Sequence, residues 1–160
     1  MLTEAEILKV WEHLLASETR ALYFADLARR YTRRKQVITG ASFFLSSAAA
    51  ATIIGRSPSW VPIACAVVTA AATAYAMASN LDGQIATLAK LHATWSQLAT
   101  QYGRLWQHVE DPDGAAQLQR LQERELEPSE LAVRSAPYNE PLLAKWQARV
   151  FQLYHLDTAA

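Results

Sequence analysis

Residues 36–81 read QVITGASFFLSSAAAATIIGRSPSWVPIACAVVTAAATAYAMASNL and contain one charged side chain, Arg56. The other 114 residues carry the remaining 29 charged groups of the chain. A helix at the surface of a water-soluble domain needs a polar face about as wide as its buried face, and the alanine runs at 48–51 and 70–72 leave no room for one. We therefore expect lipid or protein to surround this segment on all sides.

The segment divides into two uncharged stretches, 36–55 and 57–81, on either side of Arg56. Twenty residues form about 30 Å of helix, which matches the hydrocarbon core of a bilayer. Glycine, serine and proline around Arg56 favour a tight turn. The pattern predicts an all-α membrane protein, in which a two-helix transmembrane hairpin at 36–81 carries long helices that extend into a cytoplasmic helical bundle.

A cluster of basic residues precedes the first stretch: Arg29, Arg30, Arg33, Arg34 and Lys35. The turn between the stretches holds only Arg56. Because basic residues concentrate on the cytoplasmic side of a membrane protein, we expect both termini in the cytoplasm and the hairpin in the inner (plasma) membrane. The cluster is thus interpreted as a topology determinant that reaches the lipid headgroups, and the alternative is a docking site for an acidic ligand or partner.

Helices are predicted on both sides of the hairpin. Thr3 and Glu6 form a capping-box pair, so a helix should begin there and run to about Ile54. After the hairpin, apolar residues recur at heptad spacing along a seam: Leu91, Trp95, Leu98, Tyr102 and Leu105. This seam should pack on the first helix, on a neighbouring subunit, or on both.

The chain therefore divides into three expected regions, namely an N-terminal cytoplasmic helix at 1–35, the hairpin at 36–81 and a cytoplasmic helical region at 82–160. Within the last region, proline and glycine at 112–114 should end the seam helix. A short exposed helix is expected at 115–127 and a final helix, returning to the bundle, at 141–156.

Small and hydroxyl side chains form a stripe along the two stretches of the hairpin: Thr39, Ser42, Ser46, Thr69, Thr73 and Asn80. Such residues allow helices to approach closely, so one interpretation is the packing seam of the hairpin. The other interpretation is the lining of a water-filled oligomeric pore. The stretches contain no acidic residue or histidine, which disfavours a proton relay.

Nothing in the sequence indicates catalysis. Cys65 has no partner cysteine, and no phosphate-binding loop or nucleophile motif is present. The four histidines are scattered singly along the chain: His13, His92, His108 and His155. The formal net charge is zero, which gives no field to attract nucleic acid. We expect no enzyme activity, no metal, no cofactor and no nucleic-acid partner.

Two stretches of the chain resemble the SLATT family of bacterial two-transmembrane effectors. They are RALYFADLARRYTRRKQ at 20–36 and LAKLHATWSQLATQYGRLWQ at 88–107, together with the small-residue hairpin between them. The second stretch has the spacing of histidine, tyrosine and leucine seen in that family, here at His92, Tyr102 and Leu105.

The resemblance implies a homo-oligomeric effector that perturbs or permeabilises the inner membrane in antiviral defence. Its implied partners are the lipid bilayer, further copies of the chain, and a sensor protein or nucleotide ligand that acts as the trigger. The alternative is a passive membrane scaffold or adaptor that displays its cytoplasmic helices to a partner protein.

Overall fold

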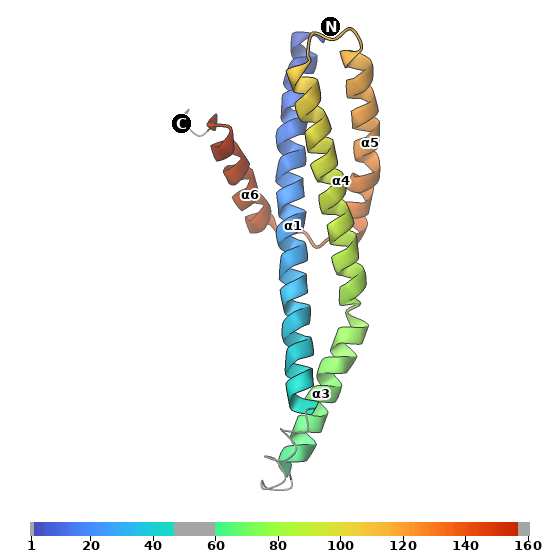
Figure 1. The fold of residues 1–160 in the computed structure, drawn as a ribbon, viewed down its shortest axis with the longest axis vertical. Coiled ribbons are helices and arrows are strands. Elements are labelled where there is room, and N and C mark those ends of the chain that lie inside the picture. Colours follow the sequence, from blue (N-terminus) through green and yellow to red (C-terminus); the bar gives the residue numbers. More distant parts are fainter. Residues whose placement is uncertain (1, 47–59, 157–160) are drawn as a thin grey trace. The chain divides into compact units, whose positions relative to one another are not determined.

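The computed structural model describes residues 2–46 and 60–156, and these residues contain helices and no strand. In chain order the helices are α1 (Glu4–Ser46), α3 (Trp60–Ala78), α4 (Leu81–Gln107), α5 (Gly114–Ser135) and α6 (Glu140–Leu153) (Figure 1). The all-helical content predicted from the sequence is confirmed.

The helices belong to two compact units. The first, which we call the bundle, consists of Met1–Leu27 and Ala86–Ala160, and the second, the α1–α3 unit, consists of Ala28–Ile85. The divisions fall within α1 and α4, whereas the sequence suggested boundaries after residues 35 and 81.

The beginning of α1 has the predicted capping box. The backbone N–H of Thr3 donates to Glu6 Oε2 at 2.8 Å, and the backbone N–H of Glu6 lies 3.3 Å from Thr3 Oγ1. The Thr3 hydroxyl also donates to Glu6 Oε2 at 2.8 Å, and the two hydrogen bonds that this carboxylate accepts from Thr3 lower the pKa of Glu6. The prediction that a helix begins here is confirmed.

The predicted transmembrane hairpin is wrong. Across residues 2–46 and 60–156, no helix combines the length and the apolar character needed to cross a membrane. Charged residues continue along α1 as far as Lys35, so most of this helix is not apolar. In α3, alanine and threonine outnumber the large apolar residues that favour insertion. Residues 47–59, which include the expected turn, lie outside the described part of the chain.

This finding also corrects the predictions that depended on the hairpin. The inner-membrane location, the transmembrane topology with cytoplasmic termini and the pore-forming role all required helices that cross the bilayer. The description of the flanking helices as cytoplasmic extensions of a membrane hairpin is corrected with them.

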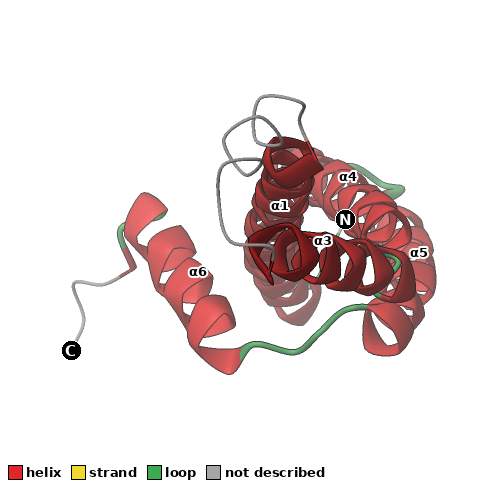
Figure 2. Cartoon of the chain, turned by 90° about the horizontal axis from the view of Figure 1, so that it is seen from below, coloured by secondary structure: helices red, strands yellow, loops and turns green. Residues whose placement is uncertain are grey.

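The core of the bundle lies between α1, α4 and α5, which run side by side, while α6 lies on the other side of α1 (Figures 1 and 2). All five residues of the predicted seam are at most 3% exposed: Leu91, Trp95, Leu98, Tyr102 and Leu105. Because a single chain is present, this burial arises from packing within the chain. Val10 and Leu14 of α1 and Leu118 of α5 are buried as well.

The end of α5 differs from the sequence-based expectation. We expected a short helix ending before Pro128, but α5 continues to Ser135 with Pro128 buried inside it. A proline in a helix interior removes one backbone hydrogen bond, and burial of its ring compensates part of that loss. The next helix begins where Asn139 Oδ1 accepts a hydrogen bond from the backbone N–H of Leu142 at 3.0 Å.

We predict that Leu91→Ala destabilises the bundle by about 2–5 kcal/mol, because Leu91 is fully buried and its truncation leaves a cavity. The free energy of unfolding should be measured by urea denaturation, followed by circular dichroism. Leu126→Ala is the matched control, since Leu126 is 69% exposed and its truncation should change the free energy little. Equal losses for the two variants would contradict the assignment of the core.

Candidate functional site

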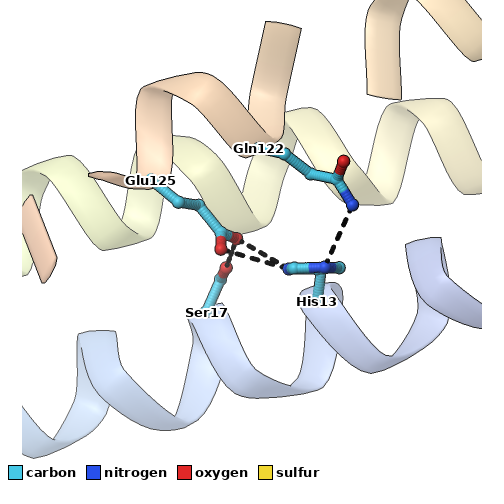
Figure 3. Close-up of polar contacts among 4 residues, drawn as sticks. All are labelled: His13, Ser17, Gln122 and Glu125. Carbon is cyan, nitrogen blue, oxygen red and sulfur yellow. Dashed lines mark hydrogen bonds and ion pairs between the residues drawn. The ribbon is translucent and has the colours of Figure 1, made fainter. Parts of the chain in front are cut away.

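A polar cluster joins α1 to α5 inside the bundle (Figure 3). Nδ1 of His13 lies 3.1 Å from both carboxylate oxygens of Glu125, and the hydroxyl of Ser17 donates to Glu125 Oε1 at 3.4 Å. On the other side of the ring, Nε2 of His13 lies 3.3 Å from Nε2 of Gln122. A neutral imidazole with its proton on Nδ1 satisfies both contacts, because Nε2 then accepts from the amide. The buried Glu125 carboxylate thus has hydrogen-bond partners on two residues of α1, His13 and Ser17.

Tyr102 of α4 completes the surroundings of this cluster. Its ring stacks on the His13 ring with centroids 5.4 Å apart and an interplanar angle of 15°. Its buried hydroxyl makes no hydrogen bond of normal geometry with any described residue. Burial raises the pKa of Tyr102, and the neighbouring Glu125 carboxylate raises it further. The raised pKa keeps the Tyr102 hydroxyl protonated, and its ring packs on the His13 ring inside the bundle.

The cluster lacks the serine–histidine contact of a serine nucleophile triad. The hydroxyl of Ser17 contacts the Glu125 carboxylate and not the His13 ring. Across residues 2–46 and 60–156, no group of three or more histidine, cysteine, aspartate or glutamate side chains could hold a metal ion. The contacts of the cluster link two helices.

A second feature of the bundle is a pocket of about 400 Å³ between α1, α4, α5 and the beginning of α6. The guanidinium carbon of Arg20 lies 4.5 Å from the centroid of the Trp95 ring, and both residues line the pocket. The sequence predicted Trp95 as part of the seam, but it gave no signal for Arg20, because the two residues lie on different helices.

Tyr23 fixes one wall of this pocket. Its hydroxyl donates to the backbone carbonyl of Pro137 at 2.8 Å and accepts from the backbone N–H of Asn139 at 3.0 Å. Through these two bonds α1 holds the connection between α5 and α6. Sequence reasoning missed Tyr23 because its partners are more than 110 positions away along the chain.

The predicted stripe of small residues lies in the α1–α3 unit: Thr39, Ser42 and Ser46 on α1, Thr69 and Thr73 on α3, and Asn80 before α4. Thr73 donates through its hydroxyl to the backbone carbonyl of Thr69 at 2.9 Å. Asn80 has φ 42°, and its Oδ1 lies 3.4 Å from the backbone N–H of Gly83. The side chain of Ser46 lies outside the described part. The pore-lining interpretation falls with the transmembrane hairpin, while the packing interpretation stays a prediction.

Two members of the basic cluster contact other helices of the same unit. Lys35 forms an ion pair with Asp82 of α4. The guanidinium carbon of Arg34 lies 5.2 Å from the centroid of the Tyr75 ring on α3. The other members are Arg29, Arg30 and Arg33, all exposed on α1. The contacts of Lys35 and Arg34 connect α1 to its neighbours, and the headgroup and docking roles of the cluster stay predictions.

No family model, curated protein or solved structure matches this chain. The resemblance to the SLATT family therefore stays a prediction.

We predict that His13 and Glu125 are energetically coupled. A double-mutant cycle with His13→Ala and Glu125→Ala should give a coupling energy within about 0.5–3 kcal/mol, because each single change leaves a buried polar group without its partner. The measurement is the free energy of unfolding at neutral pH. The control is a cycle at the exposed i,i+4 pair Glu130–Arg134, where about 0.5 kcal/mol or less is expected. A coupling energy between His13 and Glu125 that is no larger than that of the control pair would contradict the prediction.

Tyr154, which follows α6, contacts two residues of α1. Its hydroxyl donates to Glu18 Oε1 at 2.8 Å, and its ring meets the Trp11 ring edge-on with centroids 5.0 Å apart. Burial, and then the Glu18 carboxylate, raise the pKa of Tyr154 to about 12. In the unfolded chain the pKa is close to 10.

We predict a loss of stability between pH 10 and 12, because the folded chain holds the Tyr154 proton in this range and the unfolded chain releases it. The full contribution is present below pH 10. In Tyr154→Phe the free energy of unfolding should fall less steeply over this range, as measured by urea denaturation at several pH values. Tyr138→Phe, at a side chain that is 76% exposed, should keep the parent slope. An unchanged slope in Tyr154→Phe would contradict the prediction.

Proposed function

We propose that this chain is a non-enzymatic helical assembly module, which associates with further copies of itself through the α1–α3 unit and displays the bundle to a partner protein. One observation supports the proposal most strongly. Six large apolar side chains of this unit are between 55% and 79% exposed: Val37, Phe43, Phe44, Val67, Val68 and Met77. We call these six residues the apolar set. Exposed apolar residues gathered in one small unit are typical of protein interaction sites.

The helix segments that carry the apolar set favour a second copy as the partner. Neither the end of α1 after Lys35 nor α3 contains a charged residue. These two segments themselves therefore offer no charge by which to select a different partner of opposite charge. Interfaces between identical subunits are the more apolar class, and a two-fold axis brings the same apolar surface of each copy together.

The polar cluster supports the non-enzymatic part of the proposal, since Ser17 contacts the Glu125 carboxylate and not the imidazole that a serine triad uses. The proposed display of the bundle to a partner protein follows from the composition of the bundle surface. Its outer surface carries exposed charged residues of both signs, including Arg124 and Glu127 on α5. Charged surfaces of this kind provide specificity and fast association rather than obligate assembly.

We predict that the parent protein is oligomeric in aqueous buffer and that the double variant Val37→Glu/Met77→Glu dissociates it. Each buried apolar side chain contributes on the order of 1.5–3 kcal/mol, so the dissociation constant should rise by roughly 100-fold or more. Mass should be measured by light scattering after size-exclusion chromatography across a range of concentrations.

Leu126→Glu supplies the matched control, because Leu126 is equally exposed but belongs to α5. This variant should keep the parent mass. Circular dichroism should show the same helix content in all three proteins. A parent that is monomeric at every concentration, or a control that dissociates as readily as the double variant, would refute the assembly proposal.

A further inference from the structure

The pocket beside Trp95 contains one charged side chain, Arg20, among its lining residues and no acidic side chain. We propose that it binds a small amphipathic anion, with an aromatic or aliphatic body and a single carboxylate. The proposal concerns the bundle alone, and it stands whether or not the chain assembles through the α1–α3 unit.

Arg20 supplies the recognition of the anion. Its guanidinium stacks over the Trp95 ring, and it makes no hydrogen bond or ion pair with any residue in the described part of the chain. Two carboxylates of the bundle have other partners, since Glu18 accepts from Tyr154 and Glu125 accepts from Ser17. A guanidinium presents its donors in a planar fork that matches the two oxygens of a carboxylate.

The remaining walls suit an apolar body. Tyr23, Phe24 and Trp95 are at most 5% exposed and form the buried side of the pocket. Val133 and Tyr138 also line it, and they are 87% and 76% exposed, so a bound molecule can cover apolar surface that is now open to solvent. A volume of about 400 Å³ lies within the range of small-molecule sites, which are mostly apolar with a few polar groups.

The charge of the pocket limits the class of ligand. A di- or triphosphate requires several cations or a row of backbone N–H groups, whereas the lining residues include one arginine. A single negative charge is therefore the better match. The wall is also held in place before binding, because both hydrogen bonds of the Tyr23 hydroxyl fix the connection that carries Pro137 and Tyr138. Preorganisation of this kind lowers the entropic cost of binding.

The test compares two probes of the same shape, 2-naphthoate and its neutral amide, 2-naphthamide, titrated calorimetrically into the full chain. We expect the carboxylate to bind about 10-fold more tightly than the amide, as a charge-assisted bidentate contact predicts. In Arg20→Gln this preference should disappear. Arg104→Gln, the same change at an exposed arginine of α4, should retain it. Tyr138→Ala should weaken both probes to a similar degree, because it removes only apolar contact.

Three results would overturn the proposal: no binding of 2-naphthoate, equal binding of the two probes to the parent, or an unchanged preference in Arg20→Gln. The comparison on the parent needs no variant, so it holds even if Arg20→Gln folds poorly. A further arm titrates a tetrapeptide with a C-terminal phenylalanine carboxylate. If this peptide binds more tightly than 2-naphthoate, the proposed small-molecule ligand is wrong and the end of a polypeptide chain takes its place. Weaker binding of the peptide supports a small-molecule ligand.

Discussion

The burial of Trp95 and Tyr102 on one face of α4 is the constraint on which the bundle depends. Among the residues whose side chains are described, these are the two largest that are fully buried, and they lie two helical turns apart. Each also positions a polar residue of α1, since Arg20 stacks on Trp95 and His13 stacks on Tyr102. The pocket and the polar cluster therefore both originate in the heptad spacing of a single helix.

Features set by short spacings were predictable from the sequence. Thr3 and Glu6 of the capping box are three positions apart, and the buried residues from Leu91 to Leu105 follow one another at steps of three and four positions. In contrast, Arg20 with Trp95 and His13 with Glu125 are pairs separated by many tens of positions. One sequence contains no periodic signal for such pairs, because they depend on how helices pack rather than on how each helix forms.

The error over the hairpin has a different physical origin. A lack of charge from residue 36 to residue 81 indicates a surface that water solvates poorly, but it does not specify whether lipid or protein covers that surface. The prediction took the missing charge as a sign of lipid, whereas no helix of residues 2–46 and 60–156 has both the length and the apolar character of a membrane span. The exposed apolar side chains of the α1–α3 unit are poorly solvated by water for the same reason, and this favours their burial between copies of the chain.

The two proposed surfaces share no residue, because the pocket belongs to the bundle and the apolar set belongs to the α1–α3 unit. Physical continuity through α1 and α4, which enter both units, does not by itself couple them. A ligand shifts an assembly equilibrium only by its difference in affinity for the separate and associated chains. If the pocket has the same walls in both states, binding at Arg20 leaves association unchanged. Regulation would therefore require that assembly alter the position of a pocket residue, such as Arg20 on α1 or Trp95 on α4.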